Sequence, residues 1–301
     1  MAAPPVIFDR ALLRLRRRRA ARLGPATFLL DRVAGDLSDR LATVMRQFPL
    51  AADLATSGDA VRQVLLASGK VGDVVTLDED DAAAVAPGTL RVVTDIEALP
   101  LREASLDLAV SGLALQFVND LPGTLIQVRR ALKPDGLFIA ALLGGATLTE
   151  LRQALTEAEA EMEGGVSPRV APLIDVRELG ALLQRAGFAL PVTDADRVTV
   201  RYDNVIALMH DLRRMAATNP LIERRRTPLR RTTLARAGAI YADRFADSDG
   251  RIRASFEIVW LSGWAPHERQ QQPLRPGSAR TRLADALGVT EQSAGEKAGD
   301  G

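Results

Sequence analysis

Between residues 48 and 143, short apolar runs alternate with stretches of helical periodicity, and this alternation restricts the possible folds more than any other feature. Runs that are apolar throughout predict strands whose two faces are both covered by helices, as in a parallel sheet. Because parallel crossovers are right-handed, we expect a doubly wound α/β sheet. The expected strands span residues 50–54, 71–77, 90–94, 106–111 and 137–143.

The rest of the chain is organised around this region. Residues 1–45 form a basic segment that we expect to be helical, residues 46–268 a core domain, and residues 269–301 a polar tail that we expect to be disordered. Within the core domain, residues 46–145 carry the five strands. Residues 146–268 carry helical insertions and two further strands, at 192–200 and 254–261. Thr147 and Glu150 have the spacing of a capping box, which predicts a helix start there.

The composition excludes several kinds of chemistry. The 301 residues include no Cys and only two His, so we expect no metal site, and disulfides, iron–sulfur ligation and a cysteine nucleophile are ruled out. Aromatic residues make up 4% of the chain, too few for a surface that stacks single-stranded nucleic acid. The net charge of +1 implies no polyanionic partner. No apolar run has the length of a membrane-spanning helix.

Three segments concentrate charge, and we expect each to be solvated. The first 22 residues are basic, with Asp9 as their one acid. A transit segment would have this composition, and a membrane-surface helix would also be basic, but the apolar face formed by Leu12, Leu13 and Leu15 is short. We therefore favour a solvated helix with at most peripheral membrane contact. The acidic residues 157–163 and the arginine-rich residues 224–231 are interpreted as solvated surfaces as well.

Aspartates follow three of the expected strands, at the edge where doubly wound sheets bind ligands. Asp53 begins the loop after the first strand, while Asp78 ends the second and Asp95 the third. A carboxylate at the end of the second strand suits the hydroxyls of a ribose, and one at the third suits an adenine amino group. The loop after the first strand lets the backbone approach a ligand at a helix N-terminus. The three positions together predict an adenosine-containing ligand, although aspartate is also common in turns.

Several further segments occur in a recognisable order. They are Ile7-Phe-Asp-Arg10, Phe48-Pro-Leu50, Leu99-Pro100, Phe117-Val-Asn-Asp-Leu-Pro122, Leu132-Lys-Pro-Asp-Gly136, Gly144-Gly-Ala-Thr-Leu-Thr-Glu-Leu-Arg152, Glu163-Gly-Gly-Val-Ser-Pro168, Arg185-Ala-Gly-Phe188 and Gly263-Trp264 with His267-Glu268. From about Val6 to Ser278 the chain resembles class I S-adenosylmethionine-dependent methyltransferases. Within them it is most similar to the methyltransferase-fold assembly factors of respiratory NADH dehydrogenase (complex I). The malonyl-acyl-carrier-protein methyltransferases of the biotin pathway are a more distant resemblance.

The resemblance implies a Rossmann-like fold, with a seven-stranded, mostly parallel sheet whose last strand is antiparallel, and helical insertions. It also implies S-adenosylmethionine as cofactor, with Asp78 at the ribose, Asp95 and Ile96 at the adenine, and the loop from Asp53 to Asp59 at the methionine end. The implied cofactor-binding residues are Asp53, Leu54, Ala55, Ser57, Gly58, Asp78, Asp95, Ile96, Ser111 and Leu113, and the substrate-facing candidates are Gln116, Phe117, Asn119 and His267. No general base is assigned, because a sulfonium methyl group is already activated and needs mainly in-line positioning.

The loop after the first strand departs from the family pattern Asp-Leu-Gly-x-Gly-x-Gly. Ala55, Ser57 and Asp59 occupy the glycine positions, and the one glycine is shifted to Gly58. Side chains therefore stand where backbone should touch the cofactor, and Asp59 adds a negative charge near its carboxylate. We expect these changes to weaken cofactor binding. Gln116 is a further departure, since relatives commonly have His at that position.

The leading hypothesis is an S-adenosylmethionine-dependent enzyme that acts on a protein, an iron–sulfur subunit of complex I. Its outcome would be methyl transfer or arginine hydroxylation, in the cytoplasm, or in the mitochondrial matrix if the basic N-terminus is a transit segment. One alternative is a non-catalytic assembly chaperone with a degenerate cofactor loop. Another is a small-molecule or acyl-carrier O-methyltransferase. The sequence leaves the oligomeric state open.

Overall fold

The sheet has seven strands in the order β3-β2-β1-β4-β5-β7-β6. Their bounds are β1 (Phe48–Leu54), β2 (Val71–Asp78), β3 (Leu90–Val93), β4 (Leu106–Gly112), β5 (Leu132–Leu143), β6 (Ala189–Tyr202) and β7 (Ile252–Trp264). Strands β1 to β5 pair in parallel, and β7 runs antiparallel to both of its neighbours, β5 and β6. The expected mostly parallel sheet with an antiparallel last strand is therefore confirmed.

This computed structural model describes residues 6–80, 88–271, 285 and 288–289. The chain divides into two units, Met1–Pro266 and His267–Gly301. Most of the tail that was expected to be disordered, residues 269–301, lies outside the described residues. Among the described helices, none is long and apolar enough to cross a membrane.

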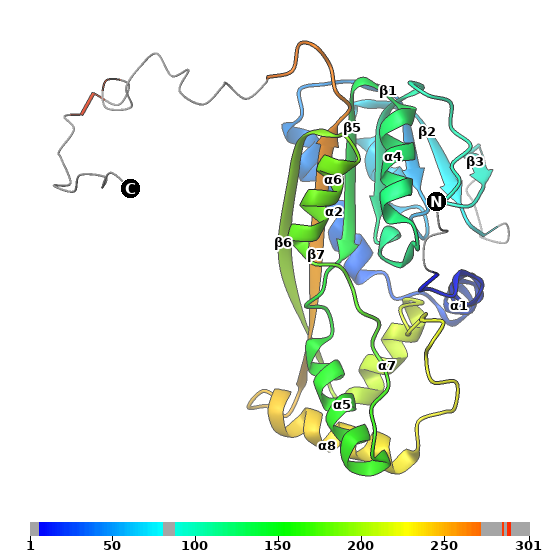
Figure 1. Ribbon diagram of the computed structural model, residues 1–301, viewed down its shortest axis with the longest axis vertical. Coiled ribbons are helices and arrows are strands. Elements are labelled where there is room, and N and C mark those ends of the chain that lie inside the picture. Colours follow the sequence, from blue (N-terminus) through cyan, green and yellow to red (C-terminus); the bar gives the residue numbers. More distant parts are fainter. Residues whose placement is uncertain (1–5, 81–87, 272–284, 286–287, 290–301) are drawn as a thin grey trace, which may run out of the picture. The chain divides into compact units, whose positions relative to one another are not determined.

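Helices cover both faces of the sheet (Figure 1). They are α2 (Phe28–Thr43) and α3 (Ala60–Ala67) on one face, and α4 (Leu121–Ala131) and α6 (Val176–Arg185) on the other. The apolar side chains of α2 recur every four residues at Val33, Leu37 and Leu41, so they form one stripe that is buried against the sheet. This stripe covers one face of the sheet, and α4 and α6 cover the other. The continuous apolar strands therefore have both of their faces buried.

A lobe extends beyond one end of the sheet (Figure 1). It consists of α5 (Thr149–Glu163), α7 (Val205–Arg214) and α8 (Arg231–Phe245), packed around the ends of β6 and β7. Its core is a separate cluster that includes the fully buried Tyr241 and Phe256. The lobe's own core lets it form a wall at the edge of the sheet where ligands bind.

Helix α5 starts differently from the sequence prediction. Its N-cap is Leu148, with a left-handed φ of 55° and no side-chain cap, so the predicted capping box is wrong. The Thr147 hydroxyl instead accepts a hydrogen bond from the Glu257 backbone N–H (3.1 Å), and the Glu150 carboxylate accepts from Ser255 (2.5 Å to Oγ). Both side chains bind β7, because the adjacent strand offers polar partners that a local pattern does not reveal.

The acidic face of α5 is only in part the solvated surface that was expected, since Glu161 is exposed whereas Glu159 is buried. The four glutamates between residues 157 and 163 each pair with an arginine: Glu157 with Arg244, Glu159 with Arg169, Glu161 with Arg236 and Glu163 with Arg225. Glu159 is fully buried. The arginine-rich residues 224–231 are mostly exposed, as expected, although Arg224 is half-buried and binds Asp9 at 3.2 Å. Packing of α8 and the loops against α5 brings these distant charges together.

Candidate functional site

The loop after β1 is the centre of the candidate site. Asp53 lies at the end of β1 and is fully buried, and Leu54 beside it belongs to the core. Ala55 has a left-handed φ of 58° and donates its N–H to the Leu77 carbonyl (2.7 Å), which ties the loop to β2. Gly58 also has a positive φ, 82°, with open space where a Cβ would be. The chain thus keeps the backbone path of a glycine-rich loop with an alanine at its first turn.

The Asp53 carboxylate has an unusual environment. Across the described residues, neither of its oxygens accepts a hydrogen bond of ordinary geometry. Burial raises the pKa of this carboxyl to about 7, and the negative charges of Asp78 and Asp59 act in the same direction, while nearby Thr56 opposes them. A buried carboxylate without donors is costly unless a cation or donor reaches it. Positive charge or N–H groups brought to Asp53 would therefore stabilise its ionised form.

Two further polar side chains of the loop, Asp59 and Ser57, stand at glycine positions of the family pattern. Asp59 accepts hydrogen bonds from Arg62 Nη1 (3.3 Å) and Gln63 Nε2 (3.1 Å) at the start of α3, so its charge is partly compensated. Ser57 is exposed.

The end of β4 is joined to the loop by hydrogen bonds. The Ser111 hydroxyl donates to the Leu54 carbonyl (2.8 Å), and the Gly112 N–H donates to Thr56 Oγ1 (2.8 Å). Leu113 follows with a left-handed φ of 51°. Gln116 donates Nε2 to the Leu113 carbonyl (2.8 Å), but its Oε1 is buried with no hydrogen-bond partner in the described part of the chain. Gln116 Oε1 is thus another buried acceptor that lacks a hydrogen-bond donor among the described residues.

Asp78 and Asp95, the other two strand-end aspartates, already have partners. Asp78 accepts from Arg91 Nη2 (3.0 Å) and from the Asp80 backbone N–H (3.1 Å). Asp95 pairs with Arg10 Nη1 at 2.6 Å. Partial burial raises the pKa of Asp95, but the Glu97 N–H and Arg10 lower it more, so the net pKa is below its ordinary value. Ile96, next in the chain, is buried in the core.

Helix α1 (Arg10–Leu23) is not the solvated helix that the sequence indicated. Arg10 contacts Glu79, Asp95 and Glu97, while Arg17 pairs with Glu79 and Arg18 with Asp80, each at 2.7 Å. These acids lie just beyond the carboxyl ends of β2 and β3. The basic helix therefore docks on the predicted adenosine end of the site.

Asn119 connects the N-terminal segment to the end of β4. Its Oδ1 accepts the N–H groups of Ile7 (2.8 Å) and Phe8 (2.7 Å), and its own N–H donates to Glu97 (2.6 Å). The rings of Phe8 and Phe117 pack edge to face with centroids 5.5 Å apart. Two sequence motifs that are more than 100 residues apart thus form one wall of the site, and Phe117 and Asn119 hold that wall.

His267, the last substrate-facing candidate, belongs to the other unit, in which its Nδ1 accepts the Arg269 N–H (3.1 Å). Sequence reasoning missed the roles of Arg10, Glu79 and Glu97, because a basic helix gives no local signal of what it docks against. Within the residues that the structure describes, no group of three His, Asp or Glu side chains has the geometry of a metal site.

Comparison with known proteins identifies the family. The methyltransferase domain model matches residues 53–140. Human arginine-hydroxylase NDUFAF5, mitochondrial, is 39% identical over 93% of this chain and 83% of its own length. The chain belongs to the NDUFAF5 family. A malonyl-[acyl-carrier protein] O-methyltransferase of Methylovorus is 31% identical over 95% of this chain and 100% of its own length. The fold is similar to that of the YcgJ protein of Bacillus subtilis, with a TM-score of 0.52 at 13% identity over 78% of this chain and 98% of that one.

The residues of the site fit S-adenosylmethionine, the cofactor that the methyltransferase domain implies. Asp53 offers a buried carboxylate whose burial the nearby Thr56 compensates only in part, and an ammonium group is a donor with the complementary charge. Gly58 leaves open space at the turn of the loop. Asp78 is partly exposed, although it is paired with Arg91. The fit is therefore better at the methionine end than at the ribose end.

Proposed function

We propose that this chain is an S-adenosylmethionine-dependent enzyme that modifies an arginine side chain of a protein during complex I assembly, in the cytoplasm or the mitochondrial matrix. The observation that carries the proposal is the similarity to arginine-hydroxylases over nearly the whole chain. The buried carboxylate of Asp53 supports it, because the ionised form of this group needs more compensation than the nearby Thr56 provides, and a cationic ligand would supply it.

Asp53, the backbone from Ala55 to Gly58, Asp78 and Asp95 would hold the cofactor. S-adenosylmethionine supplies, when bound, an electrophilic methyl group on a sulfonium. Asp53 would accept donors at the methionine end, and Asp78 would accept a ribose hydroxyl in exchange for part of its contact with Arg91. Ser111 and Thr56 hold the loop against β4 and so fix the position of these acceptors.

Gln116 would orient the substrate. Its buried Oε1 can accept an N–H of a guanidinium, which carries five donors and no acceptor. Methyl transfer would require a guanidinium nitrogen in line with the sulfonium. Hydroxylation would insert one oxygen atom into a C–H bond, which is a two-electron oxidation of the substrate. With dioxygen as the external oxidant, an external reductant would supply two electrons and two protons, and the second oxygen atom would leave as water.

The test is incubation of the full chain with S-adenosylmethionine and an arginine-containing peptide from the iron–sulfur subunit, followed by tandem mass spectrometry. A gain of one oxygen on arginine would support hydroxylation, and a gain of one CH₂ unit would support methylation. The Gln116→Ala variant should lose activity while retaining calorimetric binding of S-adenosylmethionine. No modification of the peptide, alone or within its folded subunit, in the presence of an oxidant and a reductant, would refute the enzyme proposal.

A non-catalytic assembly chaperone is the second candidate. The ion pairs of Asp78 with Arg91 and of Asp95 with Arg10 favour it, because both acids are engaged without a cofactor. Asp78→Ala should then leave complex I assembly intact in a strain that lacks the native gene. The similarity to the Methylovorus protein favours an acyl-carrier O-methyltransferase as a third candidate, which rescue of a biotin auxotroph would support.

A further inference from the structure

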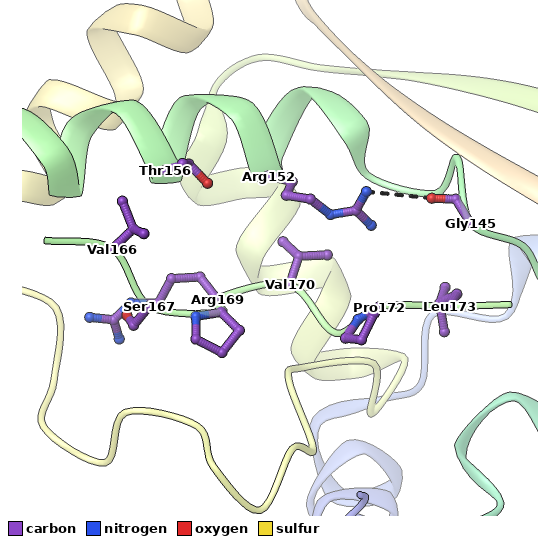
Figure 2. Close-up of a pocket in the computed structure, with 10 residues that line it drawn as sticks. Gly145, Arg152, Thr156, Val166, Ser167, Arg169, Val170, Pro172 and Leu173 are labelled. Carbon is purple, nitrogen blue, oxygen red and sulfur yellow. Dashed lines mark hydrogen bonds between the residues drawn. The ribbon is translucent and has the colours of Figure 1, made fainter.

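A groove with a volume of about 460 Å³ lies between α5 and the segment of residues 166–173. Figure 2 shows Arg152 and Thr156 on the α5 side, with Val166 and Val170 on the segment that faces them. Apart from its arginines, the lining is mainly apolar. Val166 is 62% exposed, so the groove opens to solvent.

Arg152 gives this groove a positive charge without a counter-ion. Its guanidinium donates only to the carbonyls of Gly145 (3.4 Å) and Thr147 (3.3 Å), both long hydrogen bonds, and it forms no ion pair with the residues that the structure describes. Figure 2 shows its side chain lying along the groove toward Gly145. The second arginine of the lining, Arg169, is neutralised by Glu159 at 2.5 Å. Arg152 is therefore the group available to an anion.

The wall opposite α5 is held in place before any ligand binds. The fully buried Glu159 accepts hydrogen bonds from the Ser167 N–H (2.8 Å) and from Arg169 Nε (2.6 Å). Asn219 Nδ2 donates to the Pro168 carbonyl (2.5 Å) from the other side. A preformed groove loses little entropy when it binds a peptide, so even a short segment can be recognised.

The groove adjoins the candidate reaction site. Gly145 lies two residues beyond the end of β5, which pairs with β4, and its N–H donates to the Ile174 carbonyl (3.1 Å). Ala171, in the same wall, belongs to the apolar cluster that contains Phe8 and Phe117. A peptide in the groove would thus continue toward the end of β4, where Gln116 has its unpaired acceptor.

We propose that this groove binds an acidic residue of the protein substrate, close in sequence to the target arginine, with Arg152 pairing its carboxylate. The proposal rests on the proposed function. The charge of Arg152 excludes the groove as the place of the target guanidinium, because like charges in a partly buried site repel. The valine and proline walls would contact the apolar stems of the flanking residues. Arg152 is then a specificity-determining residue.

The test uses two fluorescein-labelled peptides that are identical except for one residue. One has Glu three positions before an arginine among alanines and valines, and the other has Gln in its place. Fluorescence anisotropy with the full chain should show about tenfold tighter binding of the Glu peptide, the effect expected for a charge-assisted hydrogen bond. Arg152→Gln should remove this preference, and the exposed Arg177→Gln on α6 is the matched control that should keep it.

Three further measurements make the outcome decisive. Val166→Asp, at an exposed position, should weaken binding of the Glu peptide without affecting the fold. Arg152→Glu should reverse the preference toward a peptide with Lys in place of Glu. Equal binding of the Glu and Gln peptides by the unmodified chain, or an unchanged preference in Arg152→Gln, would overturn the proposal. Because binding is measured without turnover, these results are independent of whether any arginine becomes modified, and calorimetry with S-adenosylmethionine should show cofactor affinity unchanged in Arg152→Gln.

Discussion

Replacement of Asp53 by Asn should stabilise the cofactor-free protein at neutral and alkaline pH. Burial raises the pKa of Asp53 from 3.8 to about 7, so the native state holds this proton more tightly than the unfolded state does. Its ionisation therefore destabilises the fold as pH rises from about 4 to about 7, by an amount on the order of 4 kcal/mol above that range. An amide of the same shape carries no such penalty.

The assay is urea unfolding of both proteins at several pH values between about 5 and about 8. The stability difference in favour of Asp53→Asn should already be about 1.5 kcal/mol at about pH 5 and should grow toward about 4 kcal/mol at about pH 8. Asp73→Asn, at an exposed position of β2, is the control and should show no such trend. Parallel pH profiles for Asp53→Asn and the unmodified protein would refute the argument from burial.

The affinity of the unmodified chain for S-adenosylmethionine should rise with pH, whereas the stability of the cofactor-free chain should fall. S-adenosylmethionine brings a cation to the ionised form of Asp53, so its affinity for the unmodified chain should rise close to tenfold between about pH 5 and about pH 6. Asp53→Asn should bind more weakly and lose this dependence. A mutation that stabilises the fold while weakening ligand binding marks a functional residue. A mutation that lowered both the stability of the fold and the affinity for the ligand would indicate a structural residue.

Three more substitutions test the walls of the site. Ala55→Gly should relieve the left-handed strain of the loop, raise the free energy of unfolding in urea by up to about 1 kcal/mol and tighten S-adenosylmethionine binding in calorimetry. Asn119→Ala removes the hydrogen bonds to Ile7 and Phe8 and should cost about 2 kcal/mol, with faster amide exchange at those two residues; unchanged exchange there would contradict the tether. Burial raises the pKa of Glu159, but its hydrogen bonds with Ser167 and Arg169 lower this pKa more. Ionised Glu159 therefore stabilises the folded state above its ordinary pKa, and this contribution is lost in acid. Glu159→Gln should destabilise the fold by about 3 kcal/mol at neutral pH, abolish that acid sensitivity and loosen residues 166–173 in amide exchange.

Local patterns and tertiary contacts contribute differently to this site. The loop after β1 was predictable, because a strand that ends at Leu54 and a helix that begins at Ala60 bound it on both sides. The compensation of Asp59 by Arg62 and Gln63 was equally local, within one turn of helix, and could have been foreseen from the spacing. The predicted capping box at Thr147 failed because β7, more than 100 residues later, competes for the same side chains.

The sequence by itself determined the sheet, its helical layers and the aspartates at its binding edge, because strand and helix periodicity and strand ends are local properties of the chain. The tertiary structure alone decided which charges meet. Arg10 reaches Glu79 and Asp95, Asn119 binds the N-terminal segment, and Glu159 builds one wall of the groove beside Arg152. An arginine-rich chain offers many possible partners for each acid, and only the packing of distant elements brings a particular pair within the few ångströms at which it interacts.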